Sequence, residues 1–383
     1  MHKTRILYIE VKILSIKQIN ILKKGYYMLH NINPIIISSG AEKVFFGAAN
    51  TGDGFMNGLE CILKPYKKRI LIKGGPGTGK SSAMKRFYRM AKERGYTAEK
   101  LLCSSDPDSL DGVLIDELSL AIVDATAPHT LEPAVPGVTD SVLDPGKFWN
   151  ADTLSENAEL LCTLSQSKKC AYSLAYNMLK SASCIRSAIL ALSEDICDKE
   201  KVGSLARGIC AKALPDKQSN TKLRFRSAIS AKGYVAVDTF ERFDTDHIVI
   251  RDKFNTSNLL MSEIVRILDR RECSYIRSPD PLDPSLTDAL RIPSAHLTIT
   301  VNSAVRGAKI ISTQRYTSTE KHTLIRPDVR TLAKEFDFVT EHAFHYLDKA
   351  AKYHAQIEKI YISAMDFDAM EKDMIPLFEK ALC

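Results

Sequence analysis

The residues best suited to chemistry lie in the glycine-rich stretch KGGPGTGKSS. Residues 74–81 have the spacing G-x-x-x-x-G-K-S, which is typical of the phosphate-binding Walker A loop. Glycines let successive backbone N–H groups turn inward, and these donors can hold phosphates at the start of a helix. We expect Lys80 to contact the β- and γ-phosphates of ATP and the Ser81 hydroxyl to bind Mg²⁺. The expected nucleotide-binding residues are Gly74, Gly75, Pro76, Gly77, Thr78, Gly79, Lys80, Ser81 and Ser82.

The flanking sequence predicts a strand before this stretch and a helix after it. RILI at residues 69–72 is short, apolar and rich in β-branched residues, as a buried strand should be. Apolar residues at positions 83, 84, 87, 90 and 91 share one helical face, and Gly95 can end that helix. A dinucleotide-binding loop is excluded, because the spacing is not G-x-G-x-x-G.

A carboxylate for the metal ion is expected from Asp124. It ends LSLAIVD, an apolar run typical of a buried strand, and this is where a Walker B aspartate stands. We therefore expect Ser81 and Asp124 to bind Mg²⁺, and Lys80 and Asp124 to be the catalytic residues. The alternative for Asp124 is an ordinary turn at the end of a strand.

Two nearby segments carry further polar groups. CSSDPDSLDG contains Asp106, Asp108 and Asp111, and its proline and glycine indicate a loop. These acids suit contact with a metal, a water or a substrate hydroxyl, but turn formation and helix capping explain them equally well. DATAPHT adds Thr126 and His129, which could sense the γ-phosphate or simply lie in a surface turn.

The chain contains an internal repeat. Residues 44–123 and 223–301 share four short patterns in the same order, among them RILI with HIVI and LSLAIV with HLTITV. AYNMLKSA later resembles AFHYLDKAA, each within a long helical pattern. The sequence therefore predicts two related α/β units, each followed by a helical segment.

The second unit has lost the glycine-rich loop. The corresponding stretch, RDKFNTSNLL, contains no glycine, and Asn258 or Ser257 replaces the lysine. Asn302 stands in the place expected to match Asp124. We expect one nucleotide per chain, bound by the first unit.

KGGPGTGKSS, CSSDPDSLDG and AIVDATAPHTLEP together resemble an uncharacterised bacterial family of tandem P-loop ATPases. The resemblance covers most of residues 44–383 and implies a cytoplasmic protein with two related P-loop halves. It implies nucleotide binding at residues 74–81 and metal binding at Asp124, with undefined roles for residues 104–111 and 126–129. The family usually carries a loop in each half, so the second half departs from its pattern.

Composition excludes several classes of protein. The net charge is +7, but six basic residues and one acid within residues 1–27 leave the rest of the chain at only +2. We therefore do not expect a nucleic-acid partner. The nine cysteines lack metal-ligand spacing and are expected to be reduced thiols. Charged residues interrupt the apolar N-terminal stretch, so no transmembrane span is expected, and we favour a start at Met28.

The predicted fold class is α/β: a parallel, P-loop NTPase-like sheet flanked by helices, duplicated, with helical appendages. The helical appendages contain His342, His345 and His354, which we expect to be packed or solvated rather than metal ligands. The expected segments are an N-terminal extension at 1–27, the loop-bearing unit at 28–149, a helical segment at 150–215, a degenerate second unit at 216–327 and a C-terminal helical segment at 328–383.

Three functions fit these residues. The first is a Mg²⁺-dependent ATPase that couples nucleotide binding or hydrolysis to movement of the helical arms. No glutamate follows Asp124 to polarise water, so Glu117 or Glu132 would have to serve, and Arg251 or Arg306 could be an arginine finger. The second is a nucleotide or small-molecule kinase. The third is a non-catalytic protein that uses bound nucleotide, and the helical arms, to engage a protein partner.

Overall fold

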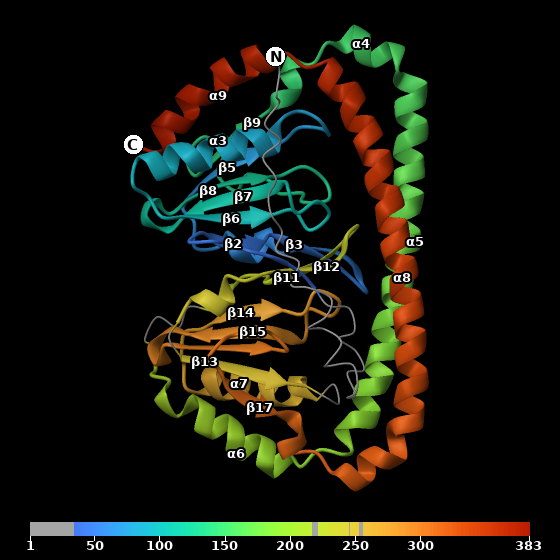
Figure 1. Cartoon of the computed structure of the whole chain (residues 1–383). Helices are drawn as coiled ribbons and strands as arrows, with labels where there is room; N and C mark the ends of the chain where they lie inside the picture. The colour runs from blue at the N-terminus through green and yellow to red at the C-terminus, as the bar shows by residue number, and fades with distance from the viewer. Residues whose placement is uncertain (1–33, 217–220, 245, 253–255) are drawn as a thin grey trace, which may run out of the picture.

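The computed structural model describes residues 34–216, 221–244, 246–252 and 256–383. Two α/β units, each built on a six-stranded sheet, lie one above the other, and a pair of long helices runs along one side of both (Figure 1). The expected N-terminal extension at residues 1–27 lies outside the described residues. In the described part of the chain, no helix is both long and apolar enough to cross a membrane.

The first sheet is mixed rather than wholly parallel. Its order is β2-β6-β7-β8-β5-β9, and β7 runs antiparallel to both of its neighbours. Short connections explain this difference from the prediction, because a parallel crossover needs a dozen or more residues. The strands are β2 (Lys43–Phe46), β5 (Lys68–Ile72), β6 (Ala98–Leu102), β7 (Leu110–Ile115), β8 (Leu120–Asp124) and β9 (Asp140–Leu143).

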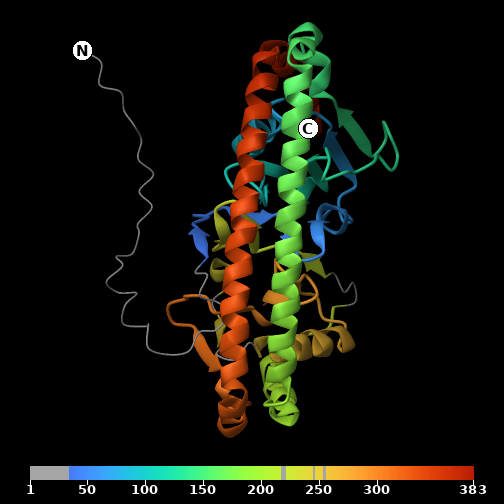
Figure 2. The same ribbon diagram turned by 90° about the vertical axis from the view of Figure 1, so that its right-hand side faces the viewer.

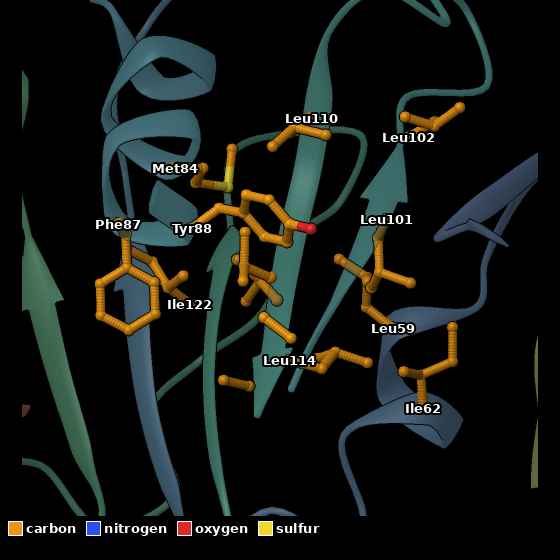
Figure 3. Close-up of a cluster of buried hydrophobic side chains, with 14 of the residues drawn as sticks. Leu59, Ile62, Met84, Phe87, Tyr88, Leu101, Leu102, Leu110, Leu114 and Ile122 are labelled. Atoms are coloured by element: carbon orange, nitrogen blue, oxygen red, sulfur yellow. The ribbon is translucent and has the colours of Figure 1, made fainter. Parts of the chain in front are cut away.

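One face of this sheet is covered by α3 (Lys80–Glu93), which follows β5. Met84, Phe87 and Tyr88 of α3 are buried on it, and Figure 3 shows them beside apolar side chains of the strands. The short helix α2 (Leu59–Ile62) closes the lower part of the same cluster. The amphipathic pattern predicted after the glycine-rich stretch is therefore confirmed.

The second unit repeats the first element by element. Its sheet has the order β10-β14-β15-β16-β13-β17, with α7 (Ser257–Arg270) after β13. The strands are β10 (Lys222–Leu223), β13 (Asp246–Arg251), β14 (Ile276–Pro279), β15 (Thr287–Ile292), β16 (Leu297–Val301) and β17 (Lys309–Ser312). The predicted duplication of the α/β unit is confirmed.

Small strands and 3-10 helices complete both units. β3 (Ala48–Thr51) and β4 (Gly54–Asn57) form a hairpin in the first unit, and β11 (Ser227–Ser230) and β12 (Gly233–Val237) form its counterpart, which β1 (Ile35–Ile37) extends. The 3-10 helices are η1 (Asp116–Leu118), η2 (Pro145–Phe148), η3 (Cys210–Lys212), η4 (Phe240–Arg242), η5 (Pro293–Ala295) and η6 (Thr313–Arg315).

The structure corrects the residue-by-residue alignment of the two units. Helices α3 and α7 begin at Lys80 and Ser257, so Ser257 rather than Asn258 replaces the lysine. Strands β8 and β16 end at Asp124 and Val301, so Val301, not Asn302, matches the aspartate. The sequence alignment of the two units is wrong by one residue at these positions, because two apolar strand sequences match almost as well when one is shifted.

The helical segments exchange partners between the units. After the first unit come α4 (Ala151–Glu156), α5 (Ala158–Glu194) and α6 (Lys199–Ile209), and α6 packs against α7 of the second unit. After the second unit come α8 (Thr319–Ser363) and α9 (Phe367–Ala381), and α9 packs against the core of the first unit. α8 thus begins before the boundary expected at residue 328.

Helices α5 and α8 run side by side over almost their whole length (Figures 1 and 2). They form an antiparallel pair whose buried residues include Ala175, Leu179 and Ala343. Each helix carries the chain from one unit to the far end of the other. We call α8 and α9 together the C-terminal arm.

The strands that precede the two loop positions, β5 and β13, lie far apart (Figure 1). Equivalent residues Phe46 and Phe225 bridge one another where the units meet. β5 and β13 lie near the opposite, outer ends of their sheets (Figure 1). The second unit therefore does not face the glycine-rich loop of the first.

Candidate functional site

The glycine-rich loop, residues 73–79, joins the end of β5 to the start of α3. Gly77 has φ +71° and Gly79, which caps the helix, has φ +77°. Left-handed backbone of this kind strains any residue with a Cβ, so the glycines are needed for the path of the loop. The strand, loop and helix lie in the order that the sequence predicted.

Lys80 points back into this loop. Its Nζ donates to the carbonyl oxygens of Gly74 and Gly75 at 2.7 and 2.8 Å and lies 3.7 Å from Asp124 Oδ2. Asp124 ends β8, which pairs in parallel with β5 so that Asp124 lies opposite Ile72. The lysine and the carboxylate, 44 positions apart in sequence, thus meet at one sheet edge.

Three other residues singled out in the sequence, Thr78, Ser81 and Thr126, form hydrogen bonds within this site. The Ser81 hydroxyl accepts from the Leu110 N–H at 3.0 Å, and Thr78 donates to the Gly75 carbonyl at 2.8 Å. Thr126 links the loop to β8: its hydroxyl donates to the Gly74 carbonyl at 2.9 Å, and its N–H donates to Asp124 at 2.8 Å. Ser82 is exposed, and Pro76 is half-buried on the loop.

The structure places the two proposed water-activating glutamates differently. Glu117 lies in η1, before β8, at the opposite edge of the sheet, where it accepts from the Thr97 N–H at 3.1 Å. Glu132 is mostly exposed and pairs at 2.6 Å with Lys73, the first residue of the loop. Glu117 therefore lies away from the loop, whereas Glu132 lies beside its first residue.

The arginine candidates are also distant from the loop. Arg251 ends β13 and Arg306 follows β16, both in the second unit. These strands lie toward the other end of the molecule from β5 (Figure 1). This arrangement therefore contradicts the hypothesis that Arg251 or Arg306 acts as an arginine finger at the loop.

The Asp108 carboxylate, one of the acids of CSSDPDSLDG, forms an ion pair with Lys232 of the second unit at 2.8 Å.

The C-terminal arm covers the glycine-rich loop instead. A Cβ added at Gly77 would lie 2.7 Å from the Glu358 carbonyl oxygen and 3.1 Å from the Tyr361 Cβ. A Cβ at Gly79 would lie 3.0 Å from Met370 of α9. The last turns of α8 and the first turns of α9 are thus in van der Waals contact with the loop.

Three charged or titratable side chains from the long helices gather at this contact. Glu358 lies beside the loop, where Lys80 and the Gly77 N–H both act to lower the pKa of its carboxylate, and its Oε1 lies 3.6 Å from His354 Nε2. His354 in turn lies 3.4 Å from Lys168 Nζ of α5. We call Lys168, His354 and Glu358 the arm cluster.

Electrostatics couples the arm cluster to Lys80. Burial raises the pKa of Glu358, and Lys80 and Lys168 oppose this rise. Burial, together with the nearby charges of Lys168 and Lys80, lowers the pKa of His354 to about 4. Burial and the positive charge of Lys80 also lower the pKa of Lys168. His354 is therefore neutral at pH 7.

Sequence reasoning missed the arm cluster, and the repeat held a signal for it. The hydrogen bonds that join the helix ends, Asn150 to Ala364 and Ser318 to Ile196, put the two long helices in register. In that register Phe336 corresponds to Lys168, Arg186 to His354 and Leu190 to Glu358. The positions of Lys168 and Glu358 are therefore apolar in the half without a glycine-rich loop.

In the second unit, an aspartate side chain accepts hydrogen bonds from the N–H groups at the start of α7. The buried Asp252 carboxylate accepts from the Thr256 and Ser257 N–H groups, each at 3.0 Å. These are N-terminal donors of α7, the groups that an anion would otherwise use. An internal carboxylate therefore occupies these donors in the second unit.

Behind the first loop lies a buried polar cluster of Cys103, Asp111 and His129. Asp111 belongs to β7 rather than to the loop that the sequence predicted. His129 Nε2 is 3.2 Å from Asp111 Oδ2, and the edge of its ring meets the Phe55 ring at 4.9 Å between centroids. Burial raises the pKa of Asp111, as does the nearby Asp124, while His129 lowers it.

A hollow of about 840 Å³ lies elsewhere, in the second unit between α6 and the strands β13 and β17. It is lined by Lys201, Lys212 and Lys309 among other residues, but it contains neither a glycine-rich loop nor the paired lysine and aspartate. We therefore place the candidate site at the loop of the first unit.

No family model, no curated protein and no solved structure matches this chain.

Proposed function

We propose that this protein binds ATP with Mg²⁺ through a P-loop in its first unit and hydrolyses it, coupling the nucleotide to movement of the C-terminal arm. The observation that carries the proposal is the meeting of Lys80 and Asp124, 3.7 Å apart, where β5 and β8 end beside the start of α3. A lysine for the phosphates and a carboxylate for the metal are the two charges that phosphoryl transfer requires there.

The arm gives the coupling a physical basis. The Gly77 amide and Lys80, two groups that the proposal assigns to phosphate, both act to lower the pKa of the Glu358 carboxylate. A triphosphate and this carboxylate are both anions, so they compete for the same donors. Binding of ATP then displaces the end of α8, which extends to the second unit.

Lys168 takes the place of the missing arginine finger in this proposal. It reaches the arm cluster from α5 rather than from the second loop, and its ammonium, 3.4 Å from His354 Nδ1, is the further positive charge that this proposal assigns to the phosphates. The contact between the loop and the C-terminal arm favours an ATPase in which bound nucleotide sets the position of the arm. The assay below distinguishes this ATPase from a kinase that transfers phosphate to a small-molecule acceptor.

The test is phosphate release and ATP binding by the full chain and by Lys80→Ala. Removing this charge should weaken ATP binding by roughly a hundredfold, since hydrogen bonds to charged groups are worth about 1.5–3 kcal/mol each. The matched control is Lys92→Ala, an exposed lysine in the last turn of the same helix, which should behave as wild type.

The results distinguish the three functions. Steady release of phosphate that needs Mg²⁺ and Lys80 supports the ATPase. Binding of one ATP per chain without turnover would support the non-catalytic protein, and turnover only with an added metabolite pool would support the kinase. Equal ATP binding by wild type and Lys80→Ala would contradict a nucleotide site at this loop.

A further inference from the structure

We propose that Cys103, Asp111 and His129 form a zinc-binding site, separate from the Mg²⁺ site of the proposed ATPase. One ligand atom from each residue lies within 4.8 Å of the other two. They come from three places in the fold: the end of β6, the strand β7 and the turn after β8. The sheet edge, rather than local sequence, brings them together.

The donor set fits zinc. A thiolate, an imidazole and a carboxylate are the three ligand types that Zn²⁺ takes, at about 2.0–2.3 Å. In a tetrahedron with such bonds, ligand atoms lie roughly 3.3–3.6 Å apart, and the Asp111 to His129 distance of 3.2 Å is close to this. The Cys103 sulfur lies within 4.8 Å of both other ligand atoms, and its approach to them would complete a three-ligand site with one position for water.

Unmatched polar atoms point to a missing ligand. Asp111 and His129 are 3% and 5% exposed, and neither Asp111 Oδ2 nor His129 Nδ1 makes a hydrogen bond of suitable geometry among the described residues, although His129 Nε2 lies 3.2 Å from Asp111 Oδ2. Buried polar atoms that lack well-formed hydrogen bonds are costly. A divalent cation between these residues would satisfy the carboxylate oxygen.

Metal binding also requires the Cys103 thiol to lose its proton, because the thiolate is the form that binds a metal. Binding of Zn²⁺ would displace the thiol proton to solvent, and the two anionic ligands would balance the charge of the ion.

The second unit shows how the same aspartate is satisfied without a metal. Asp288, the counterpart of Asp111 in β15, pairs with Arg226 at 3.1 Å and accepts from the Ser227 hydroxyl at 3.0 Å. Gly47 occupies the place of Arg226 in the first unit, and a Cβ there would lie 3.0 Å from Leu59 and 3.6 Å from the Asp111 Cβ, so no cationic side chain reaches Asp111 from this position. The first unit thus lacks the internal cation and keeps a cysteine and a histidine instead.

The experiment is titration of the metal-free full chain with Co²⁺ alone, followed by displacement with Zn²⁺. We expect about one cobalt per chain and a thiolate-to-cobalt charge-transfer band, which Zn²⁺ removes. Cys103→Ser should abolish the band, and His129→Ala should weaken binding by at least about tenfold. Cys170→Ser, an exposed thiol on α5, is the matched control and should keep the band.

Two results would overturn the proposal: no charge-transfer band in the wild-type chain, or the same band in Cys103→Ser. The wild-type titration does not depend on whether the variants fold. Lys80→Ala should bind cobalt as wild type does, so loss of ATP binding and loss of metal binding can be told apart.

Discussion

Lys80 has partners within the protein before any nucleotide arrives. Its ammonium donates to two loop carbonyls and faces Asp124, and the Glu358 carboxylate acts on the same charge. A phosphate group must replace these interactions rather than fill an unsatisfied site. The net gain from each exchanged hydrogen bond is then small, even though every single contact is strong.

Glu358→Gln should bind ATP more tightly than the wild type. The substitution keeps the shape of the side chain but removes the negative charge that competes with phosphate for the Gly77 N–H and Lys80. Loss of one charged hydrogen bond of about 1.5 kcal/mol corresponds to roughly tenfold in affinity. The measurement is a calorimetric titration with Mg-ATP at pH 7.

The matched control is Glu335→Gln, an exposed glutamate on the same helix, which should leave ATP affinity unchanged. Burial raises the pKa of Glu358, so the wild-type carboxylate becomes neutral as pH falls toward that raised value. The advantage of the variant should therefore shrink at acidic pH. Weaker ATP binding by Glu358→Gln at pH 7 would contradict a competing carboxylate.

Among the elements, β9 fixes the position of the loop-bearing strand. The buried Asp140 carboxylate at its start accepts from Arg69 of β5 at 2.5 and 2.8 Å and from the Ala134 and Val135 N–H groups at 2.9 and 3.0 Å. These bonds lower the pKa of Asp140 to about 2, although burial opposes the shift. One side chain thus joins two strands and a turn.

Asp140→Asn should destabilise the first unit by about 3 kcal/mol, because it breaks a buried pair and leaves the Arg69 charge unmatched. The carboxylate's ordinary pKa of 3.8 lies above its folded value of about 2. Its contribution is therefore complete above about pH 4 and is lost as pH falls toward 2.

Denaturant unfolding of wild type and variant between pH 7 and pH 2.5 measures this prediction. The difference in unfolding free energy should narrow over the lower part of that range. Asp53→Asn, which changes an exposed carboxylate, is the control and should alter stability little at any pH. A pH-independent difference for Asp140→Asn would show that packing, not charge, is responsible.

Local sequence patterns predict elements well, but not the contacts between distant ones. The spacing of Gly74, Gly79 and Lys80 and the apolar run before Asp124 suffice to place both sides of the loop, because each pattern is contiguous. The direction of β7 depends on loop lengths, which the apolar pattern does not encode. Lys168 and Glu358 lie far along the chain from Lys80, and only the packing of the long helices brings them together.

On the scale of the whole molecule, the two halves are tied by exchanged helices. Val202 and Ala206 of α6 belong to the core of the second unit, while Met374 and Phe378 of α9 belong to the core of the first. Each unit therefore completes its core with a helix that follows the other unit. The internal repeat predicted two units, but it could not show which helix packs on which.

This exchange predicts that both units unfold together. Phe378 is fully buried, and its ring meets Phe87 of α3 at 5.2 Å. Phe378→Ala should cost about 3–5 kcal/mol. If α9 leaves the first unit, α8 loses its anchor beside the loop, and its pairing with α5 and the second unit weakens as well.

Two probes, measured on the same samples, test whether the two units unfold together. Fluorescence of Trp149, the single tryptophan, reports on the first unit, and hydrogen exchange in α7 reports on the second. We expect one transition for both probes in the wild type and a shift of both in Phe378→Ala. Phe338→Ala, whose ring is 59% exposed on α8, should shift neither. A shift of the tryptophan signal alone would mean that the units fold independently and that the long helices transmit no stability between them.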